Sequence, residues 1–174
     1  MIDDIDTLLQ LAEIAAAFAG FAALVSVLRR RDDMLAEAVH DLLRLRLVIS
    51  SGVAGVAAAL IPVSLAGFGL EPEVAWRASA LLFLLFDNGI IVSFMRAYKP
   101  VEGAFEPDRF AVGVATFLEL VEQVSLVVVF LGFAGERAGS LYVTALVANI
   151  CQAGFIFMRF VGSAFQYQKQ LVDD

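Results

Sequence analysis

Long runs of apolar residues, separated by short segments rich in Gly, Pro and charged residues, dominate the chain. A helix needs about 20 apolar residues to cross the hydrocarbon core of a bilayer, because each residue advances the helix by about 1.5 Å. The runs that meet this requirement cover residues 5–28, 47–68, 75–94, 110–133 and 141–161. The pattern therefore predicts an all-α, polytopic membrane protein with five transmembrane helices.

The composition supports a membrane protein and excludes a soluble globular domain. Of the 174 residues, 60% are hydrophobic and only 18% are charged. No long hydrophilic stretch remains between the apolar runs, so we expect residues 1–174 to form a single transmembrane domain. The lone Cys151 excludes a disulfide scaffold, and the net charge of −7 argues against nucleic acid as a partner.

The basic residues predict how the chain is oriented, since Lys and Arg accumulate in short cytoplasmic loops. With the N-terminus outside, only Arg77 and Arg137 of the 12 basic residues fall on the outer side. This asymmetry predicts an outer N-terminus and a cytoplasmic C-terminus. The first apolar run follows Asp3, Asp4 and Asp6 and precedes its basic cluster. A secretory signal has the opposite order, so we expect a retained helix.

The segment between the first two apolar runs is expected to lie in the cytoplasm. Residues 32–44 have the spacing of a short amphipathic helix, which we predict as a separate linker. Arg29, Arg30 and Arg31 precede it and are candidates for contact with lipid or a partner protein. At the other end of the chain, residues 165–174 are expected to continue the fifth helix into water.

Four carboxyl residues and four amides interrupt the apolar runs at similar predicted depth. A charged side chain at this depth costs about 2.5–3.5 kcal/mol on insertion scales. The basic residues lie at the predicted membrane boundaries, so no cation of the chain lies at this level. The acids must therefore take up protons, bind a metal or other cation, or face a water-filled path. The residues concerned are Glu13, Asp87, Glu119 and Glu122, with Asn88, Gln123, Asn149 and Gln152.

Helical spacing predicts which faces these polar groups share. Glu119 and Glu122 are three residues apart, so they lie on one face, which we expect to point into the bundle. Glu13 stands on a face with Ala16, Ala17, Gly20 and Ala23, and such small residues permit close approach of another helix. Pro62 is expected to kink the second helix.

Two functional classes remain open. In the first, the acids pass a cation or protons across the membrane. Asp87 and Glu119 are then the central groups, Glu122 and Glu13 support them, and the four amides are neutral ligands. Five helices are few to enclose a path, so this class implies a symmetric homo-oligomer. In the second, the protein is a non-conducting membrane subunit, sensor or assembly factor whose polar residues only hold helices together.

An enzyme is the least supported class. The predicted spans contain no His for a dinuclear metal site, and no Ser–His or Cys–His arrangement is positioned for nucleophilic chemistry. A phosphate-binding loop is also missing from the sequence. We therefore expect no catalytic residues and no cofactor, and the sequence does not identify a metal.

Several short segments carry a resemblance to known proteins. The stretch from Ala12-Glu13-Ile14-Ala15 to Gly20-Phe21, the Arg29-Arg30-Arg31 cluster and Trp76-Arg77 resemble a group of small bacterial multi-pass membrane proteins. The resemblance covers about the first half of the chain. It implies a bacterial inner (plasma) membrane location and supplies no activity.

Overall fold

The computed structural model describes residues 5–28, 36–99 and 108–173. This part of the chain is helical and contains no strand. The helices are α1 (Ile5–Leu28), α2 (Ala36–Gly67), α3 (Pro72–Tyr98), α4 (Arg109–Phe130) and α5 (Ala138–Asp173), with a short 3₁₀ turn, η2, at Gly135–Arg137. All five α-helices are long and apolar enough to span a membrane, which confirms the predicted all-α class.

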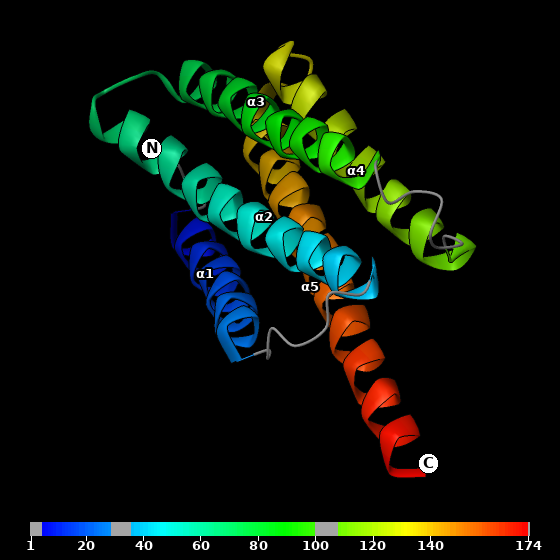
Figure 1. Ribbon diagram of the computed structural model, residues 1–174. Coiled ribbons are helices and arrows are strands. Elements are labelled where there is room, and N and C mark those ends of the chain that lie inside the picture. Colours follow the sequence, from blue (N-terminus) through cyan, green and yellow to red (C-terminus); the bar gives the residue numbers. More distant parts are fainter. Residues whose placement is uncertain (1–4, 29–35, 100–107, 174) are drawn as a thin grey trace.

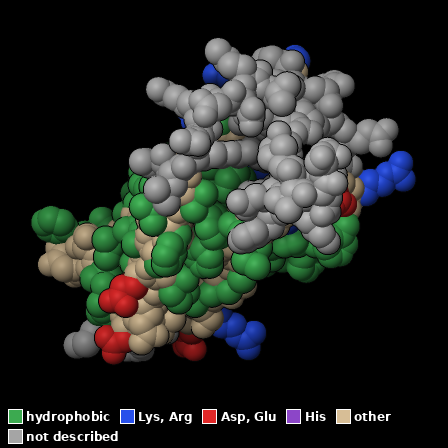
Figure 2. Space-filling model, turned by 60° about the horizontal axis from the view of Figure 1, so that its bottom comes forward, with side chains coloured by type: hydrophobic (Ala, Val, Ile, Leu, Met, Phe, Trp, Pro, Cys, Tyr) green, Lys and Arg blue, Asp and Glu red, His purple; other side chains and the backbone are tan. Residues whose placement is uncertain are grey.

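The outer surface of the helices is apolar, as a membrane-embedded protein requires. Phe21, Leu85 and Phe117 are each at least 60% exposed. Figure 2 shows hydrophobic side chains over most of the described surface on one face, with charged side chains at its edges. So much exposed apolar area is rare on a soluble monomer. The fold therefore supports a multi-pass membrane protein.

Successive helices run in alternating directions (Figure 1). α1 packs mainly on α2, α2 also contacts α3 and α5, and α4 lies between α3 and α5. Polar contacts join the helices at both ends of the bundle. Arg159 of α5 pairs with Asp108 at the start of α4, 2.7 Å apart, and Arg77 of α3 donates to the carbonyl oxygen of Leu131 at 3.0 Å.

The predicted linker helix over residues 32–44 is wrong as a separate element. Residues 36–67 form one continuous helix, α2, which begins 11 residues before the predicted start of the second span at 47. The sequence has no Gly or Pro between Ala36 and Ser51, so nothing in this stretch breaks the helix. Pro62 lies inside α2, which continues to Gly67. The cluster Arg29–Arg31 and residues 32–35 of the predicted linker lie outside the described residues.

The ends of α4 follow from local chemistry. At its start the Asp108 carboxylate accepts hydrogen bonds from the backbone N–H of Phe110 at 2.9 Å and of Ala111 at 3.4 Å. These bonds, that from Phe110 above all, and the nearby Arg159 hold the pKa of Asp108 below its usual value. α4 ends at Phe130 and not at the predicted 133, because Gly132 takes a left-handed conformation with φ of 79°.

The fifth helix is longer than its apolar run. α5 covers Ala138–Asp173, whereas the predicted span was 141–161. The prediction that the tail continues this helix is confirmed up to Asp173. α3 likewise extends to Pro72–Tyr98 beyond the predicted 75–94. In both cases polar residues at the membrane edge do not stop a helix.

Small residues bring α1 and α2 into close contact. A Cβ atom built on Gly52 would lie 2.9 Å from the Cβ atom of Ala19 and 3.0 Å from the carbonyl oxygen of Ala15. Only glycine therefore fits at this position. On the other side of α2, the buried Tyr142 hydroxyl donates to the carbonyl oxygen of Ala58 at 2.7 Å, which ties α5 to α2.

Candidate cation site

Three carboxyl groups from two helices meet inside the predicted membrane region. Asp87 belongs to α3, and Glu119 and Glu122 belong to α4. One carboxylate oxygen from each lies within 4.8 Å of one from each of the other two. Asp87 and Glu122 are buried, and Glu119 is half-buried. We call these three residues the acid cluster.

The amide of Gln123 holds two of the three acids together. Its Nε2 donates to Oδ2 of Asp87 at 2.6 Å and to Oε1 of Glu119 at 2.9 Å. Its Oε1 in turn accepts from Nδ2 of Asn88 at 3.2 Å. Gln123 therefore spans α3 and α4, and Asn88 fixes which end of the Gln123 amide faces the acids.

A second amide, Gln152 of α5, reaches the acid cluster from the opposite side of α4. Its Nε2 donates to Oε2 of Glu119 at 3.2 Å and to the carbonyl oxygen of Ala115 at 3.3 Å. Both oxygens of Glu119 thus accept from amide donors. Hydrogen bonds from amides, and not a positively charged side chain, therefore stabilise the negative charge of Glu119.

Glu122 and Asn149 are different. The Glu122 side chain is fully buried, and Asn149 on α5 is 1% exposed. Neither carboxylate oxygen of Glu122 and neither amide atom of Asn149 has a hydrogen-bond partner. The Asn149 amide lies beside the Glu122 carboxyl group, but the geometry between them falls short of a hydrogen bond. Buried polar groups without partners are rare in native proteins and call for a physical explanation.

The described residues supply no basic partner to the acid cluster. Their side-chain ion pairs are Arg77 with Glu73, 3.3 Å apart, and Arg159 with Asp108, at opposite ends of the bundle. Donation from Gln123 and Gln152 lowers the cost of burying Glu119 and Asp87 but does not neutralise three carboxylates. A proton or a cation is needed to balance the remaining charge.

Glu13 is not part of the acid cluster of the single chain, and its supporting role stays a prediction. Glu13 is exposed on α1, and a Cβ atom on Gly20 of the same face would meet nothing within 4 Å. The buried stripe of α1 is instead Leu8, Ala12, Ala15 and Ala22. The reason is rotational: α1 turns its Ala15–Ala19 side toward Gly52 of α2 and leaves Glu13 outside.

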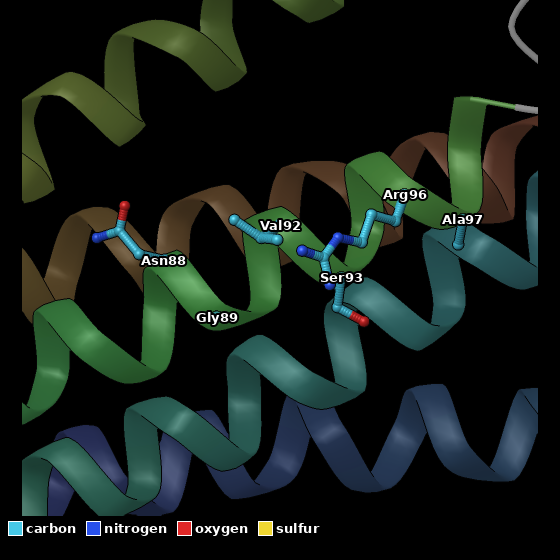
Figure 3. Close-up of a pocket in the computed structure, with 6 residues that line it drawn as sticks. All are labelled: Asn88, Gly89, Val92, Ser93, Arg96 and Ala97. Carbon is cyan, nitrogen blue, oxygen red and sulfur yellow. The ribbon is translucent and has the colours of Figure 1, made fainter.

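An open groove runs along α3 from Asn88, the residue after Asp87, to the end of the bundle that bears Arg96. Its volume is about 720 Å³, and its lining residues lie along one stretch of α3 (Figure 3). The Arg96 side chain extends back along α3 in the direction of Val92. A second cavity of about 180 Å³ lies beside Gly89 between α3 and α2. The groove residues are Asn88, Gly89, Val92, Ser93, Arg96 and Ala97.

Reasoning from the sequence did not identify Ser93 and Arg96 as part of this region. Asn88, Val92 and Arg96 are spaced by four residues, so they share one helix face, and that spacing could have revealed the groove. The sequence also offered no reason to assign different roles to the four amides. In the structure Gln123 and Gln152 donate to acids, Asn88 positions Gln123, and Asn149 is left without a partner.

Comparisons with known proteins add no assignment to this geometry. No family model, curated protein or solved structure matches the chain.

Proposed function

We propose that the protein passes a cation or protons across a membrane along Asp87, Glu119 and Glu122. The observation that carries this proposal is the convergence of three carboxylates from α3 and α4 without a basic partner among the described residues. In a bilayer such a group is costly unless protons or cations neutralise it. Glu13 lies outside the acid cluster, on the exposed side of α1.

The surroundings of the acids are consistent with the same proposal. An open groove on α3 begins at Asn88, which is hydrogen-bonded to Gln123, and reaches Arg96, although none of the three acids lines it. Toward the other end, Phe83, Leu126 and Tyr142 are fully buried and belong to one hydrophobic cluster. Under the predicted orientation, with the N-terminus outside, the groove lies on the cytoplasmic side of the acids and the apolar cluster on their outer side.

The setting of this function is also part of the proposal. The resemblance in the sequence favours a bacterial inner membrane, the basic residues favour a cytoplasmic C-terminus, and a pathway built on so few helices favours a homo-oligomer. Arg29, Arg30 and Arg31 remain candidates for contact with lipid or a partner. We expect no enzymatic activity and no cofactor.

One observation favours a second function, a non-conducting subunit. The hydrogen bonds of Gln123 and Gln152 join α3, α4 and α5, which is what amides that merely hold helices together would do. In that case the acids would stay permanently protonated and no ion would cross.

Flux through liposomes separates the two functions. The purified protein is reconstituted, and the entry of protons, Na⁺, K⁺ and Ca²⁺ is measured under an imposed gradient. We expect flux of at least one of them, and we expect Asp87→Asn or Glu119→Gln to lower it to that of empty liposomes, because each removes a charge from the only acidic path described.

The matched control is Glu13→Gln, which removes a membrane acid outside the acid cluster and should leave flux unchanged. Each variant is first checked for a monodisperse, folded state in detergent. Absence of flux for every ion in the wild-type protein, or equal flux in the Asp87→Asn and wild-type proteins, would contradict the proposal.

A further inference from the structure

The unpartnered pair Glu122 and Asn149 is the feature that the hydrogen bonds of the acid cluster leave unexplained. Both side chains are buried to at least 99%, and neither has a hydrogen-bond partner. Leaving a buried charged group unsatisfied costs more than about 1–3 kcal/mol. These two adjacent groups add to the acid cluster buried polar atoms that no neighbour uses.

We propose that a hard divalent cation of the size of Ca²⁺ binds between Glu122 and Asn149, with Asp87 and Glu119 completing its oxygen ligands. This inference rests on the proposed function in taking the acid cluster as the working site. The proposed function left open whether the acids bind a cation or protons, and the inference specifies a divalent cation.

The chemistry of the acid cluster favours this class of ion. One carboxylate oxygen of each acid lies within 4.8 Å of one from each of the other two, close enough for all three to reach one ion. Ca²⁺ accepts about six to eight oxygen ligands in a flexible geometry, whereas Mg²⁺ demands a near-ideal octahedron and keeps several waters, which a site buried between helices does not favour. Carboxylate and amide oxygens are also the ligands of a hard cation and not of a soft one.

The charge favours a cation over a proton alone. A proton on Glu122 would let its carboxyl group and the Asn149 amide hydrogen-bond to each other, but it would neutralise only one of the three acids. A divalent cation balances two of the three carboxylate charges and also offers a bond to the Asn149 oxygen. In the structure this oxygen lies toward Gly55, 3.3 Å from where a Cβ atom would be. A half-turn of the amide exchanges its oxygen and nitrogen and brings the oxygen toward Glu122.

Cation binding would change the hydrogen bonds of Gln123. Its Nε2 donates to the same carboxylates, Asp87 and Glu119, that would turn oxygens toward the ion. The amide thus stabilises the two acids while the ion is absent. Binding would weaken these two bonds.

The test is direct binding to the purified wild-type chain in detergent micelles at neutral pH. Equilibrium dialysis with ⁴⁵Ca²⁺ should show saturable binding, and Mg²⁺ and Na⁺ should compete at least about tenfold more weakly. Glu122→Gln and Asn149→Leu should each weaken Ca²⁺ binding by at least about tenfold, because even residues behind the metal ligands typically contribute 10–100-fold. Glu13→Gln should bind as the wild type does.

Folding of the variants is followed separately. Without Ca²⁺, Glu122→Gln should melt at a higher temperature than the wild type, because it removes a buried charge without a partner. Added Ca²⁺ should raise the melting temperature of the wild type but not that of Glu122→Gln. A folded wild type without saturable Ca²⁺ binding, or with unchanged binding in Glu122→Gln, overturns the inference.

The binding experiment and the flux experiment test separate claims, so either can fail while the other succeeds. Proton flux without Ca²⁺ binding would reject the inference, since water or a proton would then occupy the gap, and would keep the proposed function. Saturable Ca²⁺ binding without any flux would keep the inference and reject passage across the membrane.

Discussion

Replacing Gln123 by Met is expected to destabilise the protein by about 2–4 kcal/mol. Hydrogen bonds to charged groups contribute about 1.5–3 kcal/mol each, and Gln123 donates two of them, to Asp87 and to Glu119. Met has nearly the same length but no donor, so both carboxylates lose this partner while the packing is largely kept. Proton uptake by the acids limits the loss. The free energy of unfolding in mixed micelles, titrated with SDS, measures it.

The control for this prediction is the adjacent Val124→Met. Val124 is 53% exposed on α4, so the same new side chain there should change stability by less than about 0.5 kcal/mol. In a chain that already carries Asp87→Asn and Glu119→Gln, Gln123→Met should cost much less, because the acceptors are no longer charged. An equal cost in both backgrounds would show that Gln123 acts only through packing.

Gly52→Ala is expected to destabilise the contact between α1 and α2 by about 1–3 kcal/mol, the usual cost of overpacking. The added methyl group would lie 2.9 Å from the Cβ atom of Ala19 and 3.0 Å from the carbonyl oxygen of Ala15. These atoms belong to the backbone or are fixed to it, so a side-chain rotation cannot relieve the clash. Gly52→Leu should cost more and separate the two helices.

The same substitution at Gly20 isolates the effect of contact. A Cβ atom on Gly20 meets nothing within 4 Å, so Gly20→Ala should be neutral or stabilising by up to about 1 kcal/mol through helix propensity. Unfolding in the same SDS titration compares the two variants. If Gly52→Ala were as stable as Gly20→Ala, the close approach of α1 and α2 would be incorrect.

The number of helices could be predicted from the sequence because the bilayer sets a minimum length for each apolar run. The ends of the helices could not. α2 continues upstream of residue 47 to Ala36, and α5 continues to Asp173, because polar residues such as Arg44 and Arg46 leave the membrane without breaking a helix. Glycines with positive φ ended two helices before their apolar runs did: α4 three residues early, ahead of Gly132, and α2 one residue early, ahead of Gly69.

The positions of the acids along their helices could also be predicted, but not their rotation about each helix. The spacing of Glu119 and Glu122 placed them on one face, and the structure adds Asp87 from the neighbouring helix. Glu13 lies at similar predicted depth yet points out of the bundle, because the packing of α1 on Gly52 decides which side is buried. Likewise, depth alone did not distinguish the donating Gln123 from the unpartnered Asn149.

Infrared difference spectroscopy of the protein in lipid bilayers tests most directly whether the acids share an exchangeable positive charge. We predict a carboxylic acid C=O band that disappears on addition of Ca²⁺ and changes in Asp87→Asn, Glu119→Gln and Glu122→Gln alike, but not in Glu13→Gln. A carboxyl region that responds to neither Ca²⁺ nor pH, or that responds only through Glu13, would contradict the account.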